Sequence, residues 1–227
     1  MTAKECIMTR RSIRQFSDKP VDEAILRDII ETASFAPSWK NTQITRYVAV
    51  KGELKDKIAK ECCALHANNG RIIGDAAMLI AVTIIKGRCG FERDGSFTTK
   101  KGASWQMFDA GIASQSFCLA AHEQGLGTVI MGIWDEDGIT ELLQIPENQE
   151  LAALIAIGYP DIEPDAPKRK SSIPGSLSLR KAAAAIAPFP KIPFLLLHVF
   201  FLKFLYLSLA NIHLQINITV LYITSSY

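Results

Sequence analysis

Three arginines stand close together near the start of the chain, in the run Arg10-Arg11-Ser12-Ile13-Arg14. Guanidinium groups present fixed N–H donors that match phosphate oxygens, and a hydroxyl among them adds another hydrogen bond. A second basic run, Pro167-Lys168-Arg169-Lys170, lies far downstream. Taken alone, the first run is most simply a solvated basic face. Two such runs in one chain, however, suggest one anionic ligand, such as a phosphate attached to an aromatic ring that carries charge.

The composition is that of an ordinary globular protein with one main domain. The chain has 227 residues, 48% of them hydrophobic and 21% charged. Its formal net charge is +2, so we expect no nucleic-acid partner, because such partners need a concentrated basic surface. The first residues lack the apolar segment of a secretory signal, so we expect the domain to fold in the cytoplasm.

The residues that usually carry metal or nucleophilic chemistry show no matching pattern. The cysteines form no CxxC pair, so we expect reduced, mostly packed thiols; they are Cys6, Cys62, Cys63, Cys89 and Cys118. The histidines lack metal-ligand spacing, and we expect structural or surface roles; they are His66, His122, His198 and His213. No GxSxG or HExxH motif occurs. We therefore predict no metal site and no side-chain nucleophile.

Apolar spacing predicts alternating helices and strands. Helices are expected from Asp22 to just before Pro37 and over 53–65, 103–124 and 137–143, and strands over 46–51, 76–85, 128–132 and 151–160. The segment 87–102 is polar and contains glycine, which favours a surface excursion. Fully apolar strands predict a central sheet with helices on both faces, an α/β or α+β domain of three layers.

The expected helix over 103–124 carries small residues among its apolar ones. Ala110, Gly111, Ala113 and Ser114 would let another backbone approach closely. Periodicity alone fits a core helix and a dimer interface equally well. The glycines Gly125 and Gly127 then end the helix, and the following strand ends at a glycine whose backbone a ligand could approach.

Five motifs in this order resemble the nitroreductase family of FMN-dependent oxidoreductases. They are Arg10–Phe16, Ala36–Gln43, Asp109-Ala110-Gly111 through Gly125-Leu126-Gly127, Gly158-Tyr159-Pro160 and Lys168-Arg169-Lys170. The resemblance covers roughly residues 4–171. No single motif is decisive, but their order and spacing together are specific.

The resemblance implies an α+β fold of three layers, with a central mixed, mainly antiparallel sheet. It also implies a homodimer with two FMN sites at the subunit interface. NADH or NADPH would deliver hydride to N5 of FMN, and a nitroaromatic, quinone or similar small aromatic acceptor would take its place in ping-pong alternation. Because the flavin performs the chemistry, no catalytic side chain is expected.

Several of the implied site residues hold the phosphate and ribityl chain of FMN. They lie in the two basic runs and are Arg10, Ser12, Lys168 and Lys170, with Arg11 grouped beside them as a further cofactor-binding residue. Arg14 matches a cation beside the pyrimidine edge of the flavin, where it would stabilise the negative charge of the reduced ring and raise its potential.

Other implied positions surround the ring. Four of them match a loop that the family contributes from the other subunit: Pro37, Ser38, Trp39 and Asn41. Asn69 matches a polar contact to the ring, although a turn beside Asn68 and Gly70 is the simpler interpretation without the resemblance. The strand end at Ile130, Met131 and Gly132 would offer backbone to the flavin edge.

The chain departs from the family pattern at two places near the acceptor face. Gln43 is followed by Ile44-Thr45, where the family usually has Pro-Trp, and Trp39 stands where a small residue is common. Trp39 is either a loop aromatic packed for burial or a lid over the flavin. These departures leave the acceptor class open, and the absence of a Rossmann fingerprint leaves NADH and NADPH equally open.

The sequence changes character after Ser171. We therefore divide it into a flavin-binding domain over 1–171 and an atypical hydrophobic tail over 172–227. From Ile192 to Ile223 only Lys203 is charged, which is long enough for a membrane anchor. Polar residues interrupt this run and prolines cluster before it, so a shifted or read-through reading frame is favoured over an anchor.

Two further classes of function remain as alternatives to an oxidoreductase of this kind. One is a non-catalytic flavin-binding or membrane-associated interaction module. The other is a specialised flavin enzyme on the same scaffold, such as a dehalogenase or an enzyme that consumes flavin.

Overall fold

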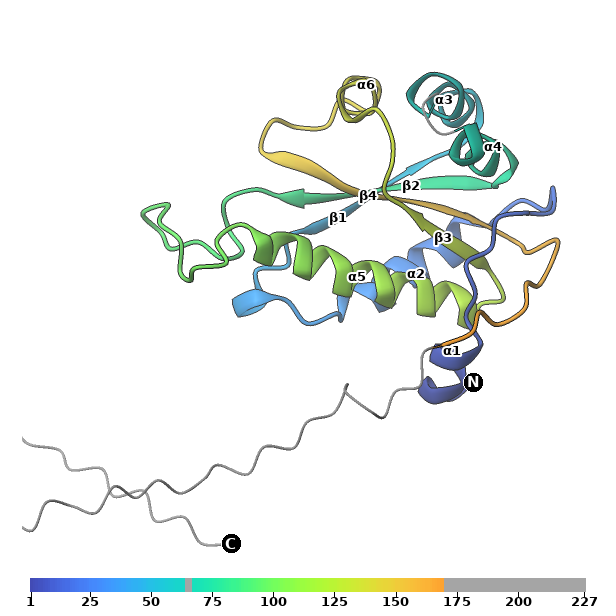
Figure 1. Cartoon of the computed structure of the whole chain (residues 1–227), viewed down its shortest axis with the longest axis horizontal. Coiled ribbons are helices and arrows are strands. Elements are labelled where there is room, and N and C mark those ends of the chain that lie inside the picture. Colours follow the sequence, from blue (N-terminus) through green and yellow to red (C-terminus); the bar gives the residue numbers. More distant parts are fainter. Residues whose placement is uncertain (64–66, 170–227) are drawn as a thin grey trace, which may run out of the picture. The chain divides into compact units, whose positions relative to one another are not determined.

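A four-stranded antiparallel sheet forms the middle layer of the molecule (Figure 1). Its strands lie in the order β1 (Thr45–Val50), β2 (Met78–Ile85), β4 (Gln149–Gly158) and β3 (Gly127–Met131). All neighbouring pairs are antiparallel. An isolated parallel bridge joins Ser12 to Thr128 of β3. The expected α+β fold with a mainly antiparallel sheet is confirmed.

This computed structural model describes residues 1–63 and 67–169. The predictions for Lys170, for the boundary at 171 and for the tail over 172–227 fall outside the described residues. Within those residues, no helix has both the length and the apolar character needed to cross a bilayer.

Helices cover both faces of the sheet (Figure 1). On one face lie α2 (Glu23–Ser34) and α5 (Ser104–Glu123), with α1 (Ala3–Thr9) near the end of α5. On the other face lie α3 (Gly52–Lys57), the π-helical turn η2 (Ile58–Cys62), α4 (Ala67–Asp75) and α6 (Glu136–Leu142). The three-layer α+β architecture is therefore confirmed.

The central strand β2 is apolar except for the buried Thr83, whose hydroxyl donates to Oε1 of Gln149 at 2.6 Å. Leu79 and Ala81 belong to the core beneath α3, α4 and α6, whereas Ile80 and Val82 belong to the core beneath α2 and α5. Both faces of the strand are buried, so both sets of alternating residues are mainly apolar.

Two helices were not predicted from the sequence. Thr2 begins α1 with a capping box, in which its hydroxyl accepts from the Glu5 N–H while the Glu5 carboxylate accepts from the Thr2 N–H. This Thr-x-x-Glu spacing is a signal of a helix start that can be read from the sequence. The other helix, α4, contains Asn69, so the interpretation of Asn69 as a turn residue is wrong. Asn and Gly are weak helix formers, and tertiary burial of Ile72 and Ile73 overrides them.

All five cysteines are buried free thiols, as expected. The segment between β2 and α5 is the surface excursion expected over 87–102. It folds back on itself, with a bridge between Phe91 and Phe97 and their rings 5.0 Å apart. It projects beyond the sheet at the left of Figure 1.

Candidate functional site

The basic segment Arg10–Phe16 lies along the free edge of β3. The N–H of Ile13 donates to the carbonyl of Thr128 at 3.0 Å. Further along, the N–H of Ser17 donates to the carbonyl of Tyr159 at 2.9 Å, just after β4. Hydrogen bonds thus hold the segment at its middle and just after its last residue, as an additional strand would be held.

Two apolar side chains of this segment enter the core, and the residues between them are exposed. Ile13 and Phe16 are buried, whereas Ser12 is half-buried and Arg14 is exposed. The Arg14 guanidinium donates to the carbonyl of Ser12 at 3.2 Å. The apolar side chains anchor the segment, and Ser12 and Arg14 are left to face outward.

Arg10 and Arg11 lie at the C-terminal end of α5, beside His122. The Nε2 atom of His122 is 2.8 Å from Oγ1 of Thr9, whose hydroxyl also donates to the carbonyl of Glu5. Burial lowers the pKa of His122, and the positive charge of Arg10 lowers it further, while Glu163 acts in the opposite direction. His122 therefore forms a basic cluster together with Arg10 and Arg11. The sequence predicted a structural or surface role for it, because no local pattern links it to Arg10.

Asn69 and the end of β3 form a second part of the site. The side-chain amide of Asn69 donates to the carbonyl of Ile133 at 3.0 Å. Ile130 and Gly132 are exposed, whereas Met131 is buried. The structure thus brings Asn69 to the end of β3, the strand along which the basic segment lies.

The loop that follows α2 is held by a buried carboxylate. The N–H of Trp39 lies 2.9 and 3.2 Å from the two carboxylate oxygens of Asp109 on α5. The indole of Trp39 is half-buried against Trp105, with ring centroids 4.7 Å apart. Lys40 pairs with Glu92 of the excursion at 3.3 Å, and its φ is +46°. This loop is a defined structure rather than a free surface segment.

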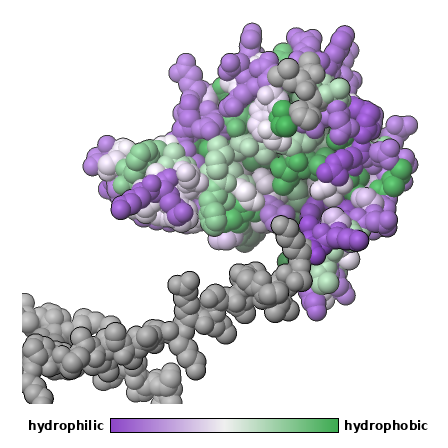
Figure 2. Space-filling view, in the orientation of Figure 1, coloured by the Kyte–Doolittle hydropathy of each residue, from purple (hydrophilic) through white to green (hydrophobic). Residues whose placement is uncertain are grey.

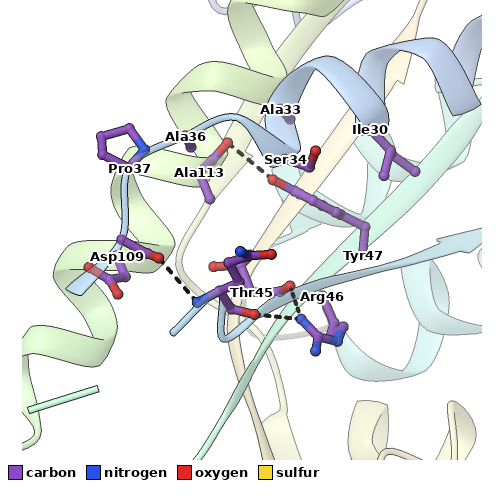
Figure 3. A pocket seen from close by; sticks show the side chains of 12 residues that line it. Ile30, Ala33, Ser34, Ala36, Pro37, Thr45, Arg46, Tyr47, Asp109 and Ala113 are labelled. Carbon is purple, nitrogen blue, oxygen red and sulfur yellow. Dashed lines mark hydrogen bonds between the residues drawn. The ribbon is translucent and has the colours of Figure 1, made fainter. Parts of the chain in front are cut away.

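A cavity of about 300 Å³ lies beside this loop (Figure 3). Pro37, Ser38 and Asp109 line it together with residues of α2 and β1. The hydroxyl of Tyr47 points to the carbonyl of Ala113 and donates to it at 3.2 Å (Figure 3). Burial raises the pKa of Tyr47 to about 12, so the phenol stays protonated and keeps this bond at neutral pH.

A buried thiol lies next to the carboxylate that holds the loop. Burial raises the pKa of Cys89 to about 12, and its hydrogen bond and charge interaction with Asp109 add to the effect. Cys89 is thus a thiol at neutral pH and not a nucleophile. In the two described ranges, no cluster of three histidine, cysteine or acidic side chains could hold a metal ion.

The predicted site residues fall into two groups within one chain. His122 follows Asp109 on α5 by thirteen positions, which is about 20 Å along a helix axis. Asp109 contacts the loop, and His122 contacts Thr9, which directly precedes Arg10. Trp39, which contacts Asp109, therefore lies apart from Arg10 and Arg11. Pro37 lies between the two groups, because it also lines a cavity together with Ile7 of α1 and Glu123 of α5. Lys168 is exposed.

Comparisons with known proteins agree with this architecture. The profile of the Nitroreductase family matches residues 7–71 and 64–159. A protein of Methanothermobacter thermautotrophicus, named as a candidate NADH dehydrogenase/NAD(P)H nitroreductase, is 33% identical over 169 residues, which are 72% of this chain and 80% of the relative.

Two solved structures are similar in fold. A nitroreductase family protein from Streptococcus pneumoniae TIGR4 has a TM-score of 0.66 at 23% identity, over 79% of this chain and 100% of that one. An FMN-dependent nitroreductase from Clostridium difficile R20291 has a TM-score of 0.61 at 25% identity, over 79% and 98% of the two chains.

Proposed function

The chain belongs to the nitroreductase family, and we propose that it is an FMN-dependent oxidoreductase that takes electrons from NADH or NADPH. The electron acceptors that we propose are nitroaromatics, quinones or similar small aromatic molecules. Each would bind after the nicotinamide has left, so that the two substrates alternate at one site. The observation that carries the proposal is the fixed position of an outward-facing Ser12 and Arg14 on the edge of β3, beside Arg10.

The residues present suit an FMN phosphate. Among residues 1–63 and 67–169, Arg10, Arg11 and Arg14 have no carboxylate within 4.0 Å, so their guanidiniums are available to an anionic ligand. Arg10 and Ser12 would hold the phosphate and ribityl chain together with Lys168, and Lys170 would complete this group. Bidentate guanidinium contacts give such a site both affinity and orientation.

Around the ring, we assign roles to residues of three elements. Bound FMN would supply the capacity to accept a hydride and to return electrons to a second substrate. Arg14 would stabilise the extra negative charge of the reduced cofactor. Asn69 would donate to the ring, and the exposed backbone at Ile130 and Gly132, with Met131 anchored between them, would face its edge.

We propose that a second copy of the chain completes the site. The contact of Trp39 with Asp109 is about 20 Å along α5 from His122, which lies beside Arg10 of the same chain. A partner subunit would therefore bring its own loop, with Pro37, Ser38, Trp39 and Asn41, to Arg10 and Arg11. Large apolar side chains are available for such a contact. Phe35 is 84% exposed and Phe108 is 58% exposed. In Figure 2, green apolar patches lie in the middle of the molecule, among white and purple ones.

The acceptor would meet an unusual aromatic pair. Trp39 packs on Trp105 of its own chain, and its indole N–H is buried without a hydrogen-bond partner in the part of the chain that the structure describes. The pair of indoles favours binding of flat aromatic acceptors over small aliphatic ones, because offset stacking on indole is favourable.

The test is the absorbance spectrum of the purified chain, followed by anaerobic titration with NADH and with NADPH. We expect a yellow protein that is bleached by a nicotinamide and regains its colour with a nitroaromatic or a quinone. Flavin that binds but ignores both nicotinamides would favour the non-catalytic module, and reduction without turnover of either acceptor would favour a specialised flavin enzyme. A colourless chain that does not bind micromolar FMN would reject the proposal.

We also propose a reducing compartment such as the cytoplasm. Its support is the state of the cysteines, all five of which are buried free thiols.

A further inference from the structure

Two glycines face one another across the pair of strands at the site. Gly127 of β3 and Gly158 of β4 are register partners, and both are buried. A Cβ at Gly127 would lie 2.5 Å from Cγ1, 2.7 Å from Cβ and 2.9 Å from Cγ2 of Ile13. Carbon atoms do not approach this closely, so no side chain fits between β3 and Ile13.

Gly158 is in the same situation with respect to Phe16. A Cβ there would lie 3.0 Å from Cδ1 of Phe16 and 3.2 Å from the backbone nitrogen of Ala77. Together Gly127 and Gly158 form a depression, here called the glycine seat, that receives Ile13 and Phe16.

Glycine stands at these two positions because there is no room for a Cβ, and not because the backbone conformation requires glycine. Six glycines of the described chain have a positive φ that disfavours other residues, and neither Gly127 nor Gly158 is among them. An alanine would adopt the same backbone angles without strain. Its methyl group would instead have to push Ile13 or Phe16 outward.

The distance to which Ile13 and Phe16 insert into the glycine seat sets the position of the proposed cofactor-binding residues Ser12 and Arg14. Ile13 and Phe16 are 5% and 7% exposed, so they are fully inserted. Ser12 and Arg14 flank Ile13 directly, so each is joined to this anchor by one peptide bond. An outward shift of Ile13 therefore moves Ser12 and Arg14 by a similar distance.

We propose that Gly127 and Gly158 are positioning residues for the anionic cofactor, because the seat that they form fixes where Ser12 and Arg14 are held. This inference rests on the proposed function, since FMN is the ligand that these residues would hold. We expect a side chain at Gly127 to disturb the segment more than one at Gly158. One of the short distances at Gly127, 2.7 Å, is to Cβ of Ile13, which no side-chain rotation can move, whereas the ring of Phe16 can shift by a few tenths of an ångström.

FMN binding tests the proposal through three Gly→Ala variants. Quenching of flavin fluorescence gives the Kd for the unchanged chain, Gly127→Ala, Gly158→Ala and the matched control Gly74→Ala, where a Cβ would meet nothing within 4 Å. We expect the Kd to rise about tenfold in Gly127→Ala, by less in Gly158→Ala and not at all in Gly74→Ala. An unchanged Kd in Gly127→Ala would overturn the proposal.

Hydrogen exchange without FMN separates this proposal from the proposed function. In Gly127→Ala, the Ile13 amide should exchange faster, because its bond to Thr128 is displaced, while the amide of Ile80 in β2 should stay protected. Equal acceleration at Ile80 would indicate general loss of the fold and reject a local role. If the unchanged chain did not bind FMN, the proposed function would fall, and this comparison would still decide whether the seat exists.

A double-mutant cycle identifies Ile13 as the side chain that is displaced. Ile13→Gly removes all three atoms that a Cβ at Gly127 would meet. In that background, Gly127→Ala should change the exchange of the residue-13 amide little further, so the two substitutions should not be additive. Full additivity would exclude contact with Ile13 as the cause.

Discussion

Asp109 and His122 lie near opposite ends of α5, and each is next to one of the two separated groups of predicted site residues. Asp109 accepts from the backbone of Trp39 in the loop after α2. His122 is hydrogen-bonded to Thr9, next to the basic segment. One straight helix therefore sets the separation of the two groups within a chain, and it does so with rigid geometry.

Removal of the Asp109 carboxylate should loosen the loop. In Asp109→Ala the N–H of Trp39 loses its acceptor in a half-buried place, and we expect a loss of about 1–3 kcal/mol in the free energy of unfolding. Asp109→Asn keeps an acceptor oxygen and should lose less. Urea unfolding measures both, and exchange of the Trp39 amide reports the loop itself. Equal stability of Asp109→Ala and the unchanged chain would contradict this role.

Substitution of Arg14 should lower the reduction potential of the bound flavin. Arg14 is exposed, so a shift of about 30 mV in Arg14→Ala is expected rather than a large one. Equilibration with a reference dye measures the potential, and far-UV circular dichroism checks that the fold is intact. The control is Arg27→Ala, an exposed arginine on α2 outside the proposed site. A potential equal to that of the control would remove the role assigned to Arg14.

A charge on the apolar surface of α5 should prevent assembly of the proposed dimer. Phe108→Glu places a carboxylate on a surface that we expect the second copy to cover, at a cost of about 2 kcal/mol or more in association. Analytical ultracentrifugation should show monomers, and the flavin content should fall because each site needs two chains. Leu54→Glu, a partly exposed position on α3, is the control. A monomeric variant with full flavin content would show that one chain suffices.

His122 should make the fold less stable in mild acid. Its pKa is lowered in the folded chain, so below about pH 6.5 the unfolded chain binds a proton that the folded chain does not. The contribution of His122 is present above that pH and is lost as the pH falls toward the folded pKa. Urea unfolding at pH 8 and pH 5.5 should show a smaller loss in His122→Gln than in the unchanged chain. Identical losses would exclude His122 as the cause.

Elements with a strong local pattern were predictable from the sequence. The strand expected over 76–85 is β2, and the helix expected over 103–124 is α5, each within two residues at either end. Both are long apolar segments that end at glycine or polar residues. In contrast, α4 depends on burial of Ile72 and Ile73 by distant parts of the chain, which no local window contains.

The same distinction applies to the candidate site. Arg10, Ser12 and Arg14 are neighbours in the sequence, so their common location follows from their spacing. The partners that hold the site are distant: Trp39 and Asp109 are 70 positions apart, and Thr9 and His122 are 113 apart. Lys55 is similar, because it resembles any surface lysine until the fold buries it against the carbonyls of Ile73, Gly74 and Ala76.

The bridge between Ser12 and Thr128 has a consequence for solubility. An unpaired outer strand is a template on which other chains add and aggregate. Here the segment that carries the three arginines shields part of β3, and its charges repel an identical chain that approaches from that side. Loss of the first sixteen residues would therefore leave β3 as an exposed, unpaired edge strand. We expect a chain truncated in this way to precipitate more readily, in addition to losing its ligand.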